Sequence, residues 1–127
     1  MKEFARSEWQ RAQRTIQSAS TLLASDPESA ASRAYYAAFH ALTALFALRG
    51  QSFTKHAALR SALHKNLINT GDWAAELGKD YDLLIELRET GDYGGTTRVS
   101  EENACRAIEA AQRIITACWP KLSSIGE

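Results

Sequence analysis

The chain has 127 residues, a length that predicts a single domain over residues 1–127, able to bury more than about 60% of its unfolded surface. Fifteen Lys and Arg residues balance fifteen Asp and Glu residues, so the formal net charge at pH 7 is zero. This balance excludes a global electrostatic field that would draw the protein to nucleic acid or to an anionic membrane, and any contact with RNA must be local.

The first predicted helix covers residues 4–24. Its apolar residues recur at spacings of three and four, with Lys, Arg, Glu and Gln between them: Trp9, Ala12, Ile16, Ala19 and Leu23. This periodicity is typical of an amphipathic helix with one buried face. The N-terminal residues contain no apolar segment of the secretory type, so we expect the protein to reside in the reducing cytoplasm.

The most informative segment is the run AYYAAFHALTALFAL at residues 34–48, which is apolar on nearly all sides. Asp26 followed by Pro27 predicts the start of the helix that contains this run, and Gly50 predicts its end. The run is shorter than the roughly 20 apolar residues that a membrane span requires, so we expect no membrane association. Because the core of a small bundle cannot cover such a helix on all sides, we expect a homodimer with this helix in or beside the interface.

Two further helices are predicted in the middle of the chain. The first covers residues 55–69, with Thr54 as its N-cap and Gly71 closing it. The second covers residues 79–90 and ends at Gly91. A short turn connects the two predicted helices.

The last predicted helix has Ser100 as its N-cap and ends at Pro120. Glu101 and Glu102 are favourably placed in its first turn, where the helix dipole attracts negative charge. No stretch alternates with period two for long enough to demand a strand. We therefore predict an all-α fold, an up-and-down four-helix bundle with an additional short helix.

Three polar residues interrupt the apolar central helix on one face. Arg33, Tyr36 and His40 lie at positions i, i+3 and i+7, within two helical turns. One interpretation is structural, in which these side chains satisfy one another's surroundings and a neighbouring helix end. The other interpretation is a binding site for an anion or an RNA backbone.

A second polar face is predicted on the third helix, where His56, Arg60 and His64 lie at i, i+4 and i+8. A zinc site would need His at both of the first two positions, whereas Arg60 intervenes and no Cys or carboxylate lies nearby at metal-binding spacing. We therefore expect no metal. A solvated basic face is the simpler interpretation of Arg60 and His64.

The segment LRETGDYGG at residues 87–95 is a further candidate site. Arg88 lies near a predicted helix C-terminus, where the helix dipole favours a cation. Its spacing from Asp92 predicts an ion pair between them, which caps the helix. The functional alternative is that Arg88, Asp92 and Tyr93 together hold a phosphodiester. The common hydrolase and nucleotide-binding signatures are absent, and we expect no cofactor.

Three motifs follow one another in the chain: SRAYYAAFHA at residues 32–41, KH at residues 55–56 and LRETGDY at residues 87–93. In their order and spacing they resemble the motifs of the small stand-alone branch of the HEPN superfamily. The resemblance implies a helical bundle that dimerises and that is paired with a minimal nucleotidyltransferase in a toxin–antitoxin or defence module. It also implies action on RNA, since many HEPN proteins are metal-independent ribonucleases whose R-x4-6-H motifs meet across the dimer interface.

The chain departs from the HEPN ribonuclease motif at its histidine. Arg88 matches the motif arginine, but Tyr93 stands where the catalytic histidine is expected. A tyrosine with an ordinary pKa near 10 is a poor base at pH 7. Arg33 and His40 formally fit R-x6-H, but they lie on the earlier helix, where the catalytic motif is not expected.

These observations leave three hypotheses for function. The first is a HEPN component of a toxin–antitoxin or defence module, in which Tyr93 accepts a nucleotide from a nucleotidyltransferase partner. The second is a non-catalytic helical dimer that binds a nucleotide or RNA through Arg33, His56 and Arg88, with Tyr36 and His40 beside them. The third is a structural adaptor without a ligand.

Overall fold

The computed structural model describes residues 1–93 and 98–122, apart from the side chains of residues 92 and 93. The regular elements of this part are all helical, as predicted: α1 (Lys2–Leu22), α2 (Pro27–Leu48), α3 (His56–Leu63), the π-helical turn η1 (His64–Ile68), α4 (Ala75–Tyr93) and α5 (Glu101–Leu122). Within the described residues, no helix is both long enough and apolar enough to cross a membrane.

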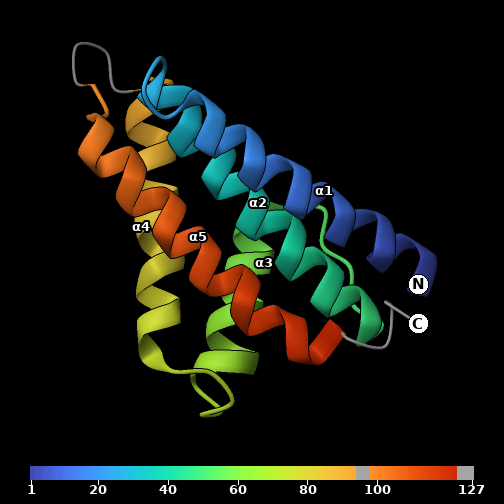
Figure 1. Ribbon diagram of the computed structural model, residues 1–127. Helices are drawn as coiled ribbons and strands as arrows, with labels where there is room; N and C mark the ends of the chain where they lie inside the picture. Colours follow the sequence, from blue (N-terminus) through green and yellow to red (C-terminus); the bar gives the residue numbers. More distant parts are fainter. Residues whose placement is uncertain (94–97, 123–127) are drawn as a thin grey trace.

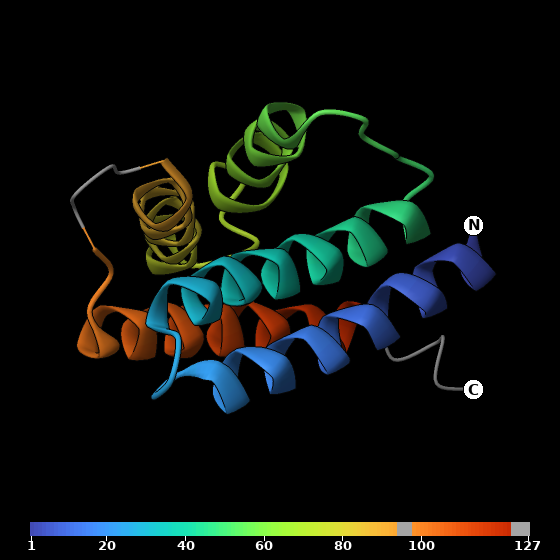
Figure 2. The ribbon, with the colours of Figure 1, turned by 90° about the horizontal axis from the view of Figure 1, so that it is seen from above.

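Helix α2 lies at the centre of the fold. Figure 1 shows α1 and α5 in front of it, and Figure 2 shows α3 and α4 on its opposite side. Helix α4 also packs against α5, which closes the bundle on one side. Every long helix of the fold therefore contacts α2.

The central position of α2 follows from its alanines. Twelve of its 22 residues are buried, and eight of these are alanine. Small side chains let several helix backbones approach α2 closely, so that α1, α4 and α5 cover most of its circumference within one chain. One chain therefore covers most of this helix but leaves Tyr36, Phe39, His40 and Thr43 half-buried, and the expected homodimer stays a prediction.

The boundaries of α2 are those predicted. The Asp26 carboxylate accepts a hydrogen bond from the Ser29 backbone N–H at 3.2 Å, and Pro27 occupies the first turn. At the other end Gly50 has φ +76°, a conformation that glycine adopts without strain and that ends the helix. Ser100 likewise caps α5, since its hydroxyl accepts from the Asn103 backbone N–H at 3.0 Å.

Several predicted boundaries are wrong, and one of them is the start of α4, which lies at Ala75 and not at Lys79. Lys55, and not Thr54, is the N-cap of α3, and it makes no side-chain capping bond. Helix α4 continues past Gly91 to Tyr93, and a Cβ at Gly91 would make only an ordinary van der Waals contact, 3.4 Å from the Glu28 carbonyl oxygen. Helix α5 continues past Pro120 to Leu122, since a proline removes only its own N–H from the last turn.

Enlarging an alanine of α2 should destabilise the fold. Ala38 is fully buried, so Ala38→Leu should lower the free energy of unfolding by about 1–3 kcal/mol, because the core has no room for the added carbons. Urea denaturation measures this change. The matched control is Ala57→Leu at an exposed position of α3, where a change within about 0.5 kcal/mol is expected. Equal stability of the two variants would contradict close packing around α2.

Candidate functional site

Side chains from four helices meet along the face of α2 that the bundle covers least. We call this group the Arg88 cluster. Its members are Glu8 of α1, Tyr35, Tyr36, Phe39 and His40 of α2, His56 of α3 and Arg88 of α4. Residues more than 50 positions apart in the chain thereby come within hydrogen-bond distance.

Arg88 is held by two tyrosines of α2. Its Nη2 donates a hydrogen bond to the Tyr36 hydroxyl at 3.0 Å. Its guanidinium carbon lies 5.1 Å from the centre of the Tyr35 ring and 5.2 Å from that of Tyr36, within the range of cation–π attraction. These contacts place a half-buried positive charge at the side of α2.

His56, the first residue of α3, joins the cluster through Tyr35. Its Nδ1 lies 3.0 Å from the Tyr35 hydroxyl, and its ring centre lies 4.5 Å from that of Phe39. Partial burial lowers the pKa of His56, and the nearby positive charge of Arg88 lowers it further. The imidazole is therefore neutral at pH 7 and able to accept a proton.

His40 is held by a buried carboxylate. Its Nδ1 lies 2.6 Å from Oε2 of Glu8, which is only 8% exposed and is the one buried charged residue in the described part of the chain. A carboxylate on Nδ1 fixes the imidazole ring and leaves Nε2 as the nitrogen that can exchange protons. The pair also joins α1 to α2 at the edge of the cluster.

Sequence reasoning did not identify Glu8, although a signal was present. Glu8 follows Ala5 by three residues and precedes Ala12 by four, so it belongs to the buried stripe of α1. A carboxylate within an apolar stripe requires a buried partner. The sequence alone could not name His40 as that partner.

The structure brings together four of the predicted site residues: Tyr36, His40, His56 and Arg88. Arg33 is exposed, and its side chain makes no hydrogen bond or ion pair with another described residue. It lines a small surface hollow together with Ser32 and Gly91. The predicted binding role of Arg33 therefore has no support from contact with the cluster.

The side chains of Asp92 and Tyr93 lie outside the described residues. The backbone of both residues belongs to the last turn of α4, close in sequence to Arg88. The predicted ion pair between Arg88 and Asp92, and the roles suggested for Asp92 and Tyr93, stay predictions.

Arg60 and His64 lie at the solvated surface, as the simpler interpretation indicated, but both pair with an acidic residue of α4. Nη2 of Arg60 lies 2.9 Å from Oδ1 of Asp82, and Nε2 of His64 lies 3.2 Å from the same oxygen. These residues connect α3 and η1 to α4, whereas His56 belongs to the Arg88 cluster. Over residues 1–93 and 98–122, no group of three or more His, Cys, Asp or Glu side chains is arranged to hold a metal ion.

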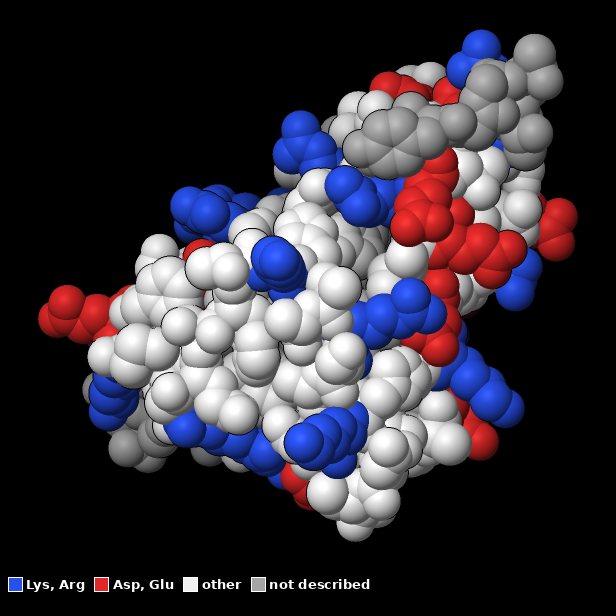
Figure 3. All heavy atoms as spheres, turned by 180° about the vertical axis from the view of Figure 1, so that it is seen from behind, with Lys and Arg blue, Asp and Glu red and all other residues white. Residues whose placement is uncertain are grey.

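The charge distribution around the cluster is uneven. Figure 3, which views the molecule from the side of α3 and α4, shows acidic side chains gathered along one edge and Lys and Arg scattered over the rest. The described acidic residues of α4 are Glu76, Asp80, Asp82, Glu86 and Glu89. Arg88 is thus one of the few basic residues of a helix whose charged residues are mostly acidic.

Comparison with known proteins identifies the family. A family model described as the HEPN domain matches residues 5–122. The UPF0332 protein of Thermotoga maritima is 37% identical over 108 residues, which cover 84% of this chain and 82% of the relative. The crystal structure of TT1696 from Thermus thermophilus has the same fold, with a TM-score of 0.80 at 23% identity over 92% of this chain and 97% of that one. The chain belongs to the HEPN family.

The environment of His56 should make stability depend on pH. Because the folded protein binds a proton at His56 less readily than the unfolded chain does, the wild type should lose stability as pH falls below the ordinary histidine pKa of about 6.5. His56→Gln removes this titration and keeps a polar partner for Tyr35. Urea denaturation of both proteins between pH 8 and pH 5 measures the difference.

The difference in the free energy of unfolding between the wild type and His56→Gln should be constant above about pH 7.5, and this range serves as the internal control. Below that pH the wild type should become less stable relative to His56→Gln. A wild type that gains stability relative to His56→Gln on acidification would contradict the lowered pKa.

Proposed function

We propose that this HEPN protein is one component of a toxin–antitoxin or defence module, that it acts with a minimal nucleotidyltransferase, and that it binds RNA through the Arg88 cluster. The single observation that carries RNA binding is the convergence of Arg88, Tyr36 and His56 from three helices at one partly open place. On a chain without net charge, RNA binding requires a local site of this kind.

Arg88 is suited to hold a phosphodiester. A guanidinium has five N–H donors in a planar fork, so it can bind the Tyr36 hydroxyl and a phosphate oxygen at the same time. The tyrosine rings restrict its motion, so less conformational entropy is lost when the phosphate binds. The phenol of Tyr36 offers a further polar contact beside the phosphate.

A second candidate function is metal-independent cleavage of the bound RNA, favoured by the two imidazoles near Arg88. The neutral His56 can accept the proton of a 2′-hydroxyl as its oxygen attacks the adjacent phosphorus. The 5′-oxygen then leaves with a proton from a second acid, a role open to His40. Because Tyr93 occupies the motif position of the histidine, we expect this cleavage to be weak.

The nucleotidyltransferase part of the proposal rests on the resemblance of the ordered motifs at residues 32–41, 55–56 and 87–93. In this proposal the hydroxyl of Tyr93 accepts the nucleotide that the partner transfers. A nucleotidyltransferase gene beside this one would support the pairing, and an isolated gene would weaken it.

We also propose that the protein is a homodimer, as HEPN domains commonly are. The surface we propose for the interface is the strip of α2 that its own chain leaves half-buried, at Tyr36, Phe39, His40 and Thr43. These residues follow one another at helical spacing and lie beside the Arg88 cluster. A second copy on this strip would place two such clusters next to each other.

RNA binding should depend on Arg88. Replacing it by alanine removes a charge-assisted contact worth about 1.5–3 kcal/mol, so Arg88→Ala should weaken binding of a short single-stranded RNA by about tenfold or more. Filter binding or fluorescence anisotropy in EDTA measures this loss. Arg14→Ala, at an exposed position of α1, is the matched control and should change the affinity by less than about threefold. Arg88→Ala with unchanged affinity would contradict the proposed site.

Incubating RNA in EDTA with the wild type, with Arg88→Ala and with alanine variants of His56 and His40 distinguishes binding from cleavage. Weak or absent cleavage in EDTA by the wild type is the expected result. Robust cleavage that both Arg88→Ala and a change of His56 or His40 to alanine abolish would establish a ribonuclease at this site. Robust cleavage that survives all three changes would place the reaction elsewhere in the protein.

The oligomeric state should depend on the half-buried strip of α2. Sedimentation of the wild type at micromolar concentration should give twice the chain mass of 14.0 kDa. Thr43→Glu puts a charge on the strip and should shift the protein towards monomer. Thr21→Glu on the exposed surface of α1 is the control and should sediment like the wild type. A wild-type monomer would contradict the proposed dimer.

A further inference from the structure

The buried carboxylate of Glu8 has one close partner. A buried carboxylate is costly unless an opposite charge lies against it. Nδ1 of His40 lies 2.6 Å from Oε2 of Glu8, whereas Nη1 of Arg11 lies 3.9 Å from Oε1 and belongs to a side chain that is 54% exposed. The close partner is therefore the imidazole of His40, and the carboxylate favours the positively charged form of that ring.

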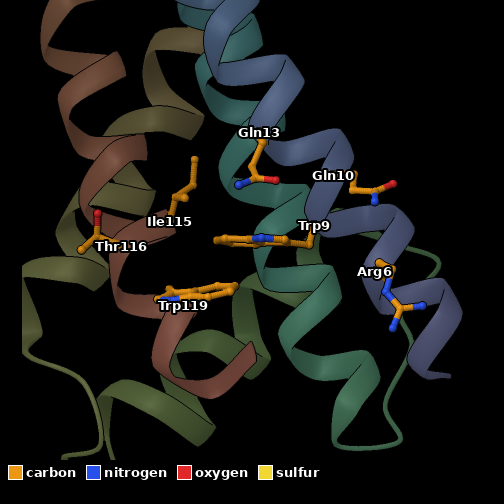
Figure 4. A pocket seen from close by; sticks show the side chains of 7 residues that line it. All are labelled: Arg6, Trp9, Gln10, Gln13, Ile115, Thr116 and Trp119. Carbon is orange, nitrogen blue, oxygen red and sulfur yellow. The ribbon is translucent and has the colours of Figure 1, made fainter. Parts of the chain in front are cut away.

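The packing of α1 holds this carboxylate in place. Trp9, the residue after Glu8, is only 8% exposed, and its ring stacks on that of Trp119 of α5 with centres 5.6 Å apart. Figure 4 shows the two indoles one above the other between α1 and α5. Ala5 and Ala12, one turn to either side of Glu8, are fully buried. The backbone that carries Glu8 is thus fixed on both sides, as a group that orients another side chain requires.

His40 keeps one ring nitrogen for a ligand. Nδ1 contacts Glu8, and Nε2 makes no hydrogen bond with another described residue. The side chain of His40 is 16% exposed, and its ring centre lies 6.4 Å from that of Tyr36. Because the hydroxyl of Tyr36 binds Arg88, a phosphate held by Arg88 would lie on the side of α2 that carries His40.

The second imidazole of the cluster has the opposite surroundings. The ring centre of His56 lies 6.0 Å from that of Tyr36, and its Nδ1 contacts the neutral hydroxyl of Tyr35 and not a carboxylate. Partial burial and the positive charges of Arg88 and His40 lower the pKa of His56. One imidazole thus faces a negative charge and the other faces positive charges, an arrangement that separates an acid from a base.

We propose that Glu8 is a positioning residue that makes His40 the proton donor of the Arg88 cluster. This inference rests on the RNA cleavage proposed above as the second candidate function. As the 2′-hydroxyl gives its proton to His56, its oxygen bonds to the phosphorus, and the bond from phosphorus to the 5′-oxygen breaks. The charged His40 gives its Nε2 proton to that oxygen. The products are a 2′,3′-cyclic phosphate and a free 5′-hydroxyl, with His40 neutral and His56 charged.

Replacing the 5′-oxygen of the RNA by sulfur tests proton donation directly. A thiol has an ordinary pKa near 8.5, far below that of an alcohol, so a thiolate leaves without a proton from an acid. In EDTA, Glu8→Gln and His40→Ala should slow single-turnover cleavage of the oxygen-linked RNA at least about tenfold. The same variants should change cleavage of the sulfur-linked RNA by less than about threefold, whereas His56→Ala should slow both reactions.

Two further variants separate the carboxylate from the helix that carries it. Glu8→Asp keeps the carboxylate and should recover part of the rate that Glu8→Gln loses on the oxygen-linked RNA. Glu3→Gln, at an exposed position of the same helix, is the matched control and should cleave both RNAs like the wild type.

The charge on His40 can also be measured without any reaction. The chain has three histidines, so nuclear magnetic resonance of ¹⁵N-labelled protein resolves each ring, and His40→Ala identifies the signals. At pH 7 both ring nitrogens of His40 should carry protons in the wild type, and one of them should lose its proton in Glu8→Gln. Equal protonation of the ring in the two proteins would overturn the proposal.

Equal slowing of both RNAs by Glu8→Gln would overturn it as well, since a damaged fold would then explain the loss of rate. A wild type that cleaves neither RNA would contradict the cleavage function itself. The resonance measurement then decides by itself whether Glu8 holds His40 in its charged form.

Discussion

The fold depends on close packing around one helix. Eight buried alanines let α1, α4 and α5 approach α2, and the resulting contacts bury the large apolar side chains of the core. Because most of α2 is covered in this way, its polar residues can reach solvent only along one narrow strip. Tyr36 and His40 lie on that strip, so the packing of the core also decides where a site can form.

Each functional group of the Arg88 cluster is positioned by a partner on another helix. Glu8 orients His40, the Tyr35 hydroxyl orients His56, and two tyrosine rings hold Arg88. These contacts also join α1, α3 and α4 to α2. The same interactions thus stabilise the bundle and arrange the site, which is why variants here need a stability measurement beside any functional one.

The chain has no net charge, but its charged side chains are unevenly distributed in the fold. Most charged side chains of α4 are acidic, and two of those that the structure describes pair with arginines of other helices, Asp80 with Arg113 and Asp82 with Arg60. Arg88 also lies against the rings of Tyr35 and Tyr36, within the range of cation–π attraction.

The sequence by itself determined the helices and the central place of α2, because helical periodicity and caps such as Asp26 are local properties. It also marked Arg88 and His56 as candidate site residues, since their motifs are contiguous. Helix ends were less predictable, since α4 runs through Gly91, although glycine often marks the end of a helix.

Only the tertiary structure decided which of these residues meet. Spacing along a helix shows which side chains share a face, but it does not show which face of another helix lies opposite. The rotation and approach of α1 and α4 on α2 brought Glu8 to His40 and Arg88 to Tyr36, and they left Arg33 outside the cluster. Contacts between helices depend on packing over the whole core, and a pattern within one segment cannot specify them.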